Sequence, residues 1–219
     1  PERNIQFEKT LVSTGTNYEG IHTMENAAFE FENETWGKLL VIAFEFAPRD
    51  EALDWARQLI ESDRFKNHTV IILTHSFLLN NGERIVNEGY KLTPRNWAQA
   101  VWDKLIYPSK NIKLVLCGHT GTPPQMNDSE KVDYHTTTAC RVDPAADGHK
   151  VVQMMFNSQN GDGSWNGNGG DCWLRILEFK PDGKTIGIRT FSPLFALSRR
   201  TQHMAWRTDA YDQFSITIE

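Results

Sequence analysis

The chain has 219 residues, of which 39% are hydrophobic, and its formal net charge at pH 7 is −5. This length is usual for one domain, and the apolar content is sufficient for a sizeable core. The negative charge and the lack of a long Lys/Arg run argue against nucleic acid or an anionic membrane surface as a partner. We therefore expect one domain over residues 1–219 that binds neither.

The ends and the cysteines add little about the location of the protein. No apolar stretch approaches the roughly 20 residues that a transmembrane helix needs. Cys117, Cys140 and Cys172 are widely separated and odd in number, so they predict neither a disulfide framework nor a cysteine metal cluster. The chain begins with Pro1 rather than Met, so we expect that an upstream segment, with any export signal, could have been removed.

The first half of the sequence alternates strands and helices. Short continuous apolar runs predict three buried strands, at 39–44, 70–74 and 112–117. Apolar residues at three-to-four-residue spacing predict a helix over 51–62 with Asp50 as its N-cap. A second helix is predicted over 93–107, with Pro94 near its first turn. This order indicates an α/β fold with parallel crossovers.

The second half changes character, because no helical pattern separates its strands. The predicted strands are 134–141, 151–157, 173–179, 185–191 and 213–218. Antiparallel pairing is expected among them, and residues 181–184, Pro-Asp-Gly-Lys, have the composition of a hairpin turn. The Gly/Asn-rich stretch 159–171 is predicted to be an ordered surface loop.

Two of the predicted buried strands run directly into a histidine, His75 and His119. Ligands of open α/β sheets gather outside the carboxyl ends of the strands, and imidazole is the commonest protein ligand for catalytic divalent metals. The two histidines could therefore share one metal. Position alone leaves the alternative open that they are unrelated side chains at strand ends.

The segments around these histidines carry a family resemblance. Residues 71–75, Ile-Ile-Leu-Thr-His, and 115–119, Val-Leu-Cys-Gly-His, resemble the last two motifs of the calcineurin-like metallophosphoesterases. Residues 46–56, 173–175 and 190–193 resemble further segments of bacterial, often exported, members. The resemblance runs from about residue 39 onward.

The resemblance implies a fold, an activity and a location. The fold is a four-layer α/β/β/α sandwich with mixed sheets, to which this chain contributes the later strands, antiparallel toward the C-terminus. The activity is hydrolysis of a phosphate monoester or diester with Mn, Fe, Zn or Mg, in which His75 and His119 bind the same metal. A periplasmic or secreted location is implied for the protein, and a small phosphoester for its substrate.

The sequence also departs from the family pattern, and these departures bear on its activity. The Asp-x-His, Gly-Asp and Gly-Asn-His-Asp motifs are missing and would lie upstream of Pro1, and Gly121 stands where the family has its last histidine. We therefore expect a truncated domain that binds metal weakly and is inactive alone. Its uncovered apolar face would be closed by the missing N-terminal half or by a second copy.

A non-catalytic binding module on the same fold is the alternative function, and carbohydrate would suit the tryptophans Trp36, Trp165 and Trp206. Gly121 favours this alternative, whereas the predicted helices argue against a carbohydrate-binding β-sandwich. Five residues are candidates to face a substrate: His135, Asp162, Trp165, Asn168 and Asp171. The alternative is that they are structural or solvated. Arg199-Arg200 could clamp a phosphate or be a solvated pair. The remaining histidines, His22, His68, His149 and His203, are interpreted as structural or solvated.

Overall fold

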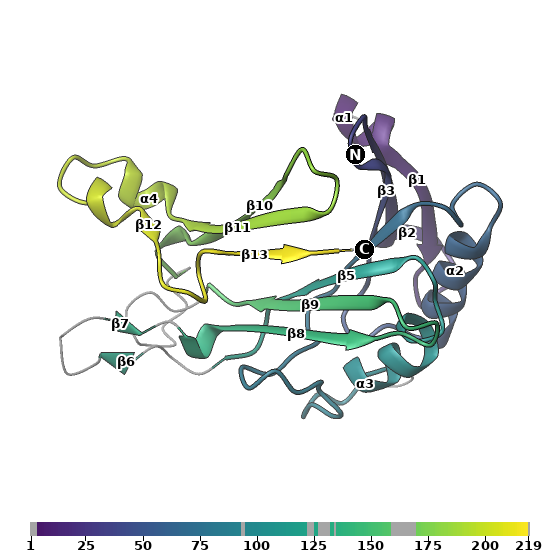
Figure 1. Cartoon of the computed structure of the whole chain (residues 1–219). Helices are drawn as coiled ribbons and strands as arrows, with labels where there is room; N and C mark the ends of the chain where they lie inside the picture. The colour runs from purple at the N-terminus through teal and green to yellow at the C-terminus, as the bar shows by residue number, and fades with distance from the viewer. Residues whose placement is uncertain are drawn as a thin grey trace.

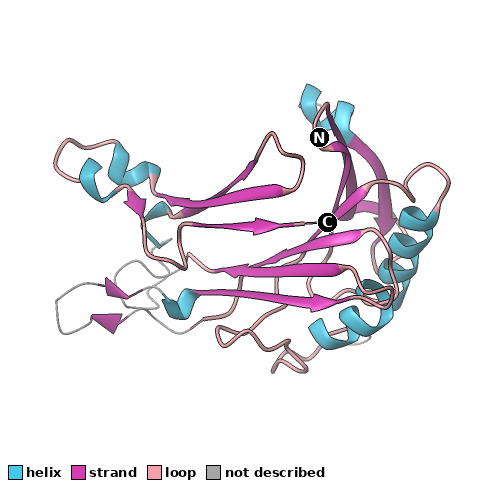
Figure 2. Ribbon diagram, in the orientation of Figure 1, coloured by secondary structure: helices cyan, strands magenta, loops and turns pink. Residues whose placement is uncertain are grey.

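The fold is known from a computed structural model, which describes residues 4–92, 95–121, 125–126, 132–133, 135–158 and 170–218. In this part of the chain a seven-stranded mixed sheet has helices on one face and a second sheet on the other (Figure 1). Figure 2 shows that strands dominate and that the helices are few. The predicted α/β class is confirmed.

The large sheet has the strand order β1-β2-β3-β4-β5-β9-β8. Its strands are β1 (Leu11–Thr16), β2 (His22–Asn33), β3 (Gly37–Ala43), β4 (Thr69–Leu73), β5 (Ile112–Cys117), β8 (Thr138–Pro144) and β9 (Lys150–Phe156). The three strands predicted in the first half of the chain, β3, β4 and β5, are adjacent and parallel. They form the centre of the sheet, as their continuous apolar runs predict.

The pairing of β9 corrects the expectation for the second half of the chain. β9 pairs antiparallel with β8, as expected, but it also pairs parallel with β5. It therefore continues the parallel centre, and the apolar sequence Val151–Phe156, mostly buried, agrees with this place. The expected strand 134–141 begins later than predicted, because His135–Thr137 form a 3-10 turn, η2, ahead of β8.

The helix α2 (Asp50–Glu61) follows its predicted range, but its cap differs. The N-cap is Arg49, without a side-chain cap, and Asp50 is the first helical residue. The Asp50 carboxylate accepts hydrogen bonds from Asn96 at 3.0 Å and Lys104 at 2.7 Å instead. Its acidic charge still lies in the first turn, where it complements the helix dipole.

The second predicted helix is shorter than expected. It consists of α3 (Ala98–Val101) and a π-helical turn, η1 (Trp102–Ile106), with Trp97 as N-cap. Residues 95–97 are not helical, so the expected start near Pro94 is wrong, and residues 93–94 lie outside the described part. Trp97 is extended, as an N-cap residue generally is. Three residues of the apolar face that the sequence predicts, Val101, Leu105 and Ile106, are buried, and the fourth, Trp97, precedes the helix.

The second sheet is antiparallel and contains the C-terminal strands. It consists of β10 (Leu174–Phe179), β11 (Thr185–Phe191), β12 (Trp206–Arg207) and β13 (Phe214–Thr217). The predicted turn joins β10 to β11, with Gly183 at φ +70° and the Asp182 carboxylate accepting from the backbone N–H of Lys184 and Thr185. The glycine supplies the positive φ that the sequence predicts, and the aspartate adds side-chain hydrogen bonds to the turn.

Several short elements were not predicted. They are α1 (Ile5–Thr10), the hairpin β1–β2, α4 (Pro193–Ala196), the 3-10 turns η3 (Gly170–Cys172) and η4 (Gln202–Met204), and the small pair β6 (Gln125–Met126) and β7 (Val132–Asp133). The hairpin extends the large sheet by two antiparallel strands. Its strand β2 has few buried residues, which explains why no continuous apolar run marks it.

Two apolar clusters lie on the two faces of the large sheet. The larger packs the strands against α2 and α3–η1, and includes Leu53, Ile72 and Leu105. The smaller packs Ile71 and Leu114 against Ile188 and other residues of the second sheet. The described residues therefore form three layers, helix on sheet on sheet. None of their helices is long and apolar enough to cross a membrane.

Candidate functional site

His75 and His119 lie together at the carboxyl edge of the large sheet. Each follows the end of a strand, β4 or β5, and these two strands are parallel neighbours. The backbone N–H of Gly118 donates to the carbonyl oxygen of His75 at 3.0 Å, which extends the strand pairing to the histidines. Nε2 of His75 is 3.0 Å from Nδ1 of His119. The sequence places both residues at one sheet edge, and the structure brings their rings into contact.

The backbone at His119 has an uncommon conformation. His119 has φ of +69°, in the left-handed region that non-glycine residues seldom adopt. The Asn157 side-chain N–H₂ donates to the carbonyl oxygens of His119 at 3.1 Å and of Thr120 at 3.0 Å. The Thr120 hydroxyl donates in turn to the carbonyl oxygen of Leu78. The turn is thus fixed from two sides, and such strain is concentrated at functional sites.

Glu88 completes this cluster and was missed in the sequence. Its carboxylate lies 3.3 Å from Nε2 of His119 and accepts a hydrogen bond from the Ser76 hydroxyl. Glu88 comes from the loop between β4 and α3, so neither a strand end nor a helix periodicity marks it. When a histidine binds a metal through one ring nitrogen, a carboxylate at the other nitrogen fixes its tautomer and ring orientation.

The electrostatics favour a neutral His75. Partial burial lowers the pKa of His75 below its usual value, and the neighbouring His119 lowers it further, against the opposing effect of Glu88. A neutral imidazole has a lone pair free for a metal, or for an N–H···N hydrogen bond to its neighbour.

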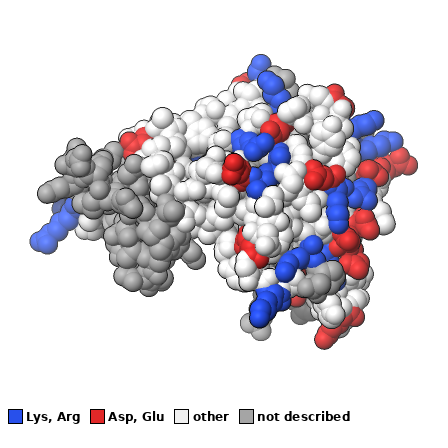
Figure 3. Space-filling model, turned by 90° about the horizontal axis from the view of Figure 1, so that it is seen from below, with Lys and Arg blue, Asp and Glu red and all other residues white. Residues whose placement is uncertain are grey.

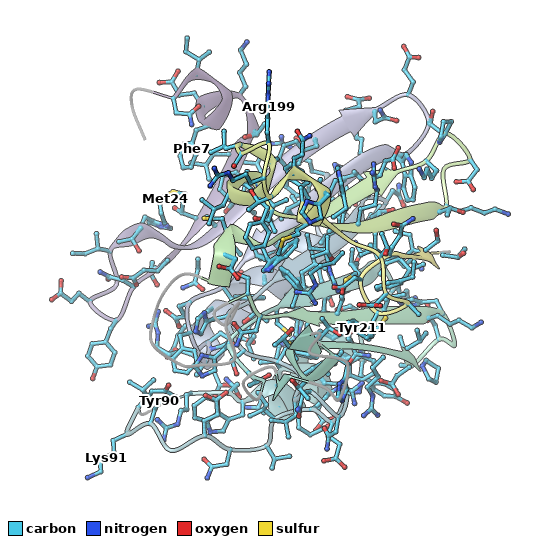
Figure 4. All side chains as sticks on the ribbon, turned by 90° about the vertical axis from the view of Figure 1, so that its left-hand side faces the viewer. Phe7, Met24, Tyr90, Lys91, Arg199 and Tyr211 are labelled. Atoms are coloured by element: carbon cyan, nitrogen blue, oxygen red, sulfur yellow. The ribbon has the colours of Figure 1, made fainter. Side chains whose placement is uncertain are left out.

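An aromatic wall stands beside the two histidines. The ring of Phe46 makes edge contacts with His75, Tyr90 and Trp97, at centroid distances of 5.4, 5.2 and 5.8 Å. Its centroid is 5.8 Å from that of His119. Tyr90 lies on a loop that protrudes from the body of the molecule (Figure 4). Aromatic rings limit the access of water to one side of the pair.

The pair fits one metal geometrically but does not complete a site. Two nitrogens bound tetrahedrally to one zinc ion at about 2.0–2.1 Å are roughly 3.3–3.4 Å apart. The 3.0 Å between Nε2 of His75 and Nδ1 of His119 is close to this separation, and it is also the length of a hydrogen bond between the two rings. Within the described residues, however, no group of three or more His, Cys, Asp or Glu side chains is placed to hold a metal ion. The described chain therefore provides two converging ligands, fewer than catalytic sites generally use.

Gly121 has a structural reason to be glycine. Its φ is +140°, and a Cβ built on it would lie 2.9 Å from the carbonyl oxygen of Thr136. A histidine at this position would therefore need the backbone of both segments to move. The family resemblance leads one to expect a histidine here. The sequence has glycine instead, and the local backbone conformation leaves no room for a histidine side chain.

A cavity of about 300 Å³ opens between the two sheets next to His75. Its lining includes the ends of β4 and β5, Phe156 at the end of β9, and the buried side chain of Arg175 from β10. Arg175 was not singled out as a candidate in the sequence, because a lone arginine within an apolar strand has no motif around it.

The other candidates do not join the His75–His119 cluster among the described residues. His135 lines a larger cavity of about 670 Å³, which Arg175 also lines, and its ring centroid is 6.4 Å from that of Tyr211. Asp171 lies in η3 at φ +54°, and its carbonyl oxygen accepts from the Ser192 hydroxyl at 2.6 Å. Asp162, Trp165 and Asn168 lie outside the described residues.

The structure describes the arginine pair and two of the three tryptophans, Trp36 and Trp206, the latter 40% exposed. Arg199 and Arg200 are exposed, and Figure 4 shows Arg199 on the opposite side of the view from Tyr90. Trp36 packs edge-on against Phe179 and donates its indole N–H to the carbonyl oxygen of Lys180 at 2.7 Å. It therefore joins the β2–β3 hairpin to the second sheet.

Three of the remaining histidines have local partners. His68 bonds Glu30 at 2.8 Å, His149 bonds Asp147 at 2.5 Å, and His22 bonds the carbonyl oxygen of Thr14 at 2.8 Å. His203 is exposed. On the face drawn in Figure 3, acidic and basic side chains lie next to one another.

Comparison with known proteins gives little further guidance. No protein-family model matches the chain. It is similar to the uncharacterized protein YvnB of Bacillus subtilis (strain 168), with 21% identity over 208 residues. The match covers 92% of this chain but 14% of that protein, so the chain spans a small part of the length of its relative.

Proposed function

We propose that this chain is the C-terminal part of a metal-dependent phosphoester hydrolase domain of the calcineurin-like metallophosphoesterase type. One observation carries the proposal: Nε2 of His75 and Nδ1 of His119 converge at 3.0 Å from the ends of two adjacent parallel strands. The order of the motifs around these histidines supports it. In the four-layer sandwich of this family, the three described layers would be completed by a further helical layer.

The residues of this chain would act as binding and orienting groups. His75 and His119 would hold one divalent ion, Mn, Fe, Zn or Mg, and Glu88 would fix the His119 ring through its other nitrogen. Phe46, with the rings around it, would keep water from that side. In the complete site two such ions supply an activated water and neutralise the charge that develops on the phosphoryl oxygens.

The remaining ligands would have to come from residues beyond those described, in the N-terminal half that the family pattern calls for. With two ligands only, this chain alone should bind divalent metal weakly and should not hydrolyse phosphoesters. The exported, periplasmic or secreted, location remains part of the same proposal, because it rests on the same resemblance.

The test compares this chain with the longest product of its gene. Metal content and p-nitrophenyl phosphate hydrolysis are measured for both, and for the His75→Ala and His119→Ala variants of the longer product. We expect bound metal and turnover in the longer product, and loss of both in each variant. His203→Ala, which changes an exposed histidine, is the matched control and should behave as the parent.

Two outcomes would reject this proposal. One is a longer product that is free of metal and inactive after incubation with each of the four ions. The other is nanomolar zinc binding by this chain alone that His75→Ala abolishes, because a site with two protein ligands should not reach that affinity.

A non-catalytic binding module is the second candidate, and Gly121 favours it. The position where the family has its last histidine cannot hold a side chain without a shift of the backbone near Thr136. The first outcome above would favour this candidate, and a screen of soluble oligosaccharides against the longer product would then test the carbohydrate ligand that the tryptophans suggested.

A further inference from the structure

The second sheet ends at β10, which has a strand partner on one side only within the described part of the chain. The backbone N–H of Lys180 donates to the carbonyl oxygen of Thr185 at 2.9 Å, in register with the β10–β11 pairing. Because hydrogen-bonded pairs alternate along an antiparallel ladder, every second residue of β10 points its backbone N–H and C=O away from β11. These residues are Arg175, Leu177 and Phe179.

A further strand can pair with this edge. Within the described residues, no hydrogen bond joins these backbone groups to another part of the chain. Each residue offers one donor and one acceptor in an alternating row, which an extended polypeptide backbone matches and a small molecule does not. Natural proteins generally cover or protect an edge of this kind. The edge of β10 therefore selects a β-strand as its partner.

An apolar groove runs along the same edge. Two cavities, of about 430 and 300 Å³, border β10 on the side of the large sheet and share the side chains of Leu73, Leu116 and Leu177. The larger cavity reaches Trp36, and the smaller one reaches His75. The two cavities form one groove from the β10–β11 turn to the carboxyl edge of the large sheet. We call it the β10 groove.

The floor of the β10 groove is a part of the large sheet that the second sheet leaves uncovered. Phe31 and Leu73 are 45% and 46% exposed, although β2 and β4 both have strand partners on two sides. Apart from Asn33, the residues that line the larger cavity are apolar or aromatic. A connected apolar face of this kind marks an interaction site, unlike apolar residues scattered singly over a surface.

We propose that an extended segment of the polypeptide preceding this chain adds to the second sheet beside β10 and covers the β10 groove. The inference rests on the proposed function, in which this chain is the C-terminal part of a longer domain. Backbone hydrogen bonds to β10 would hold the segment, and its alternate side chains would be apolar and would contact the floor of the groove.

The position of α1 favours an upstream segment as the occupant. The ring of Phe7 in α1 packs edge-on against Phe29 of β2 at a centroid distance of 5.5 Å. Phe29 and the exposed Phe31 are two residues apart in one strand, so their side chains lie on the same face of the sheet. α1 therefore lies on the face that contains the β10 groove. The Bacillus relative, of which this chain matches 14%, has the additional length that such a segment needs.

A second copy of this chain does not fit the same place. In each copy β10 lies over the large sheet, since Leu177 packs on the cluster that contains Ile71. The floor of the groove extends past β10, as the exposed Phe31 shows. Two copies joined through β10 would each place their own large sheet beneath the joined strands, so the two large sheets would occupy the same space.

Amide hydrogen exchange tests the inference on this chain and on the longer product of its gene, both free of metal and at two protein concentrations. The amides of Leu177 and Phe179 report on the free edge, whereas those of Ile176 and Glu178 face β11 and are internal controls. We expect the edge amides to exchange freely in this chain. In the longer product they should exchange at least about tenfold more slowly at both concentrations, because a strand hydrogen bond has to open first.

Two leucine substitutions give a second measurement. Leu73→Asn changes the floor of the β10 groove, whereas Leu79→Asn changes a leucine that is 37% exposed and lines neither cavity. In this chain both variants should lower the urea midpoint of unfolding slightly and to a similar extent. In the longer product Leu73→Asn should lower it more than Leu79→Asn, because the added strand would bury that side chain.

Three results would overturn the inference: edge amides that exchange as fast in the longer product as in this chain, protection that appears only at the higher protein concentration, and equal effects of the two leucine variants in the longer product. The second result would identify another copy as the occupant. Protected edge amides in a longer product that binds no metal and is inactive would support the inference and reject the hydrolase. Unprotected amides in an active longer product would do the reverse.

Discussion

The two faces of the large sheet are covered in different ways. On one face α2 and α3–η1 pack onto the strands and bury a large continuous cluster. On the other face the second sheet lies over the strands with a smaller cluster (Figure 1). Cavities of about 670, 430 and 300 Å³ remain between the two sheets and at their margins. We call the helical face the closed face, although a cavity of about 330 Å³ lies at the ends of α2 and η1, and the sheet-to-sheet face the open face.

This difference separates stability from the candidate chemistry. The closed face buries most of the apolar surface, so it should supply most of the stabilisation. The open face contains the cavity of about 300 Å³ that His75 lines, and it runs up to the His75–His119 pair. Binding sites are generally concave and partly preformed, and the margin of the open face is concave.

The comparison predicts unequal effects for two neighbouring isoleucines of β4. Ile72 is fully buried against the helices, whereas Ile71 faces the second sheet and lines the cavity of about 430 Å³. Ile72→Ala should lower the free energy of unfolding by about 2–5 kcal/mol, because it leaves a cavity in a packed core. Ile71→Ala should cost about 2 kcal/mol or less, since part of its surroundings is already empty.

Urea denaturation of both variants measures the difference. The substitutions are chemically identical and lie in consecutive residues of one strand, so strand propensity and unfolded-state effects largely cancel. Equal losses of unfolding free energy would show that the sheet-to-sheet face is as tightly packed as the helical face.

The same contrast explains what could be predicted from sequence. The central strands β3, β4 and β5 have buried or half-buried apolar side chains on both faces over most of their length. Their continuous apolar runs led directly to their positions and to the meeting of His75 and His119. β2 was missed because most of its side chains are exposed or half-buried, so it has no such run. The parallel pairing of β9 was missed because it depends on where the chain returns, which local periodicity does not encode.

Within the candidate site, the histidines were predicted and their partners were not. His75 and His119 follow strand ends, a position that can be read from sequence, whereas Glu88 reaches them from a long loop. Arg175 occupies one position of an ordinary strand, and its contacts with Phe156 and Asp212 join residues that are distant in sequence. Spatial neighbours of this kind are set by tertiary packing.

The connection across the open face predicts an intermediate effect for Trp36→Phe. The indole N–H of Trp36 donates to the carbonyl oxygen of Lys180 at 2.7 Å, joining the β2–β3 hairpin to the β10–β11 turn. Phenylalanine retains an aromatic ring against Phe179 but loses this hydrogen bond. The free energy of unfolding should fall by about 0.5–1.5 kcal/mol, independently of pH.

Chemical denaturation at pH 7 and at pH 5 checks this prediction. Trp206→Phe is the control, because Trp206 packs on Phe191 within the second sheet and does not connect it to the large sheet. An effect of Trp36→Phe no larger than that of the control would mean that the hydrogen bond between the two sheets adds nothing measurable to stability.

The closed face has an ionic tie instead, and its effect should depend on pH. The Glu30 carboxylate of β2 bonds His68 at 2.8 Å and Arg64 at 2.5 Å, both in the segment that follows α2. The hydrogen bond from His68 is the main cause that lowers the pKa of Glu30 below its usual value of 4.5, with burial opposing it.

Because the folded-state pKa of Glu30 is the lower one, its stabilising contribution is complete above pH 4.5 and is lost as the pH falls through the folded-state value. We therefore expect the parent to lose more unfolding free energy than Glu30→Gln as the pH falls from 6 to below that value. The difference should be about 1 kcal/mol, as for a single hydrogen bond, because His68 is buried but the Glu30 carboxylate is partly exposed. Unfolding free energies across this range measure it, with Glu32→Gln, an exposed neighbour on β2, as control. If Glu30→Gln and the parent lose stability in parallel, the connection of α2 to the sheet depends on apolar packing alone.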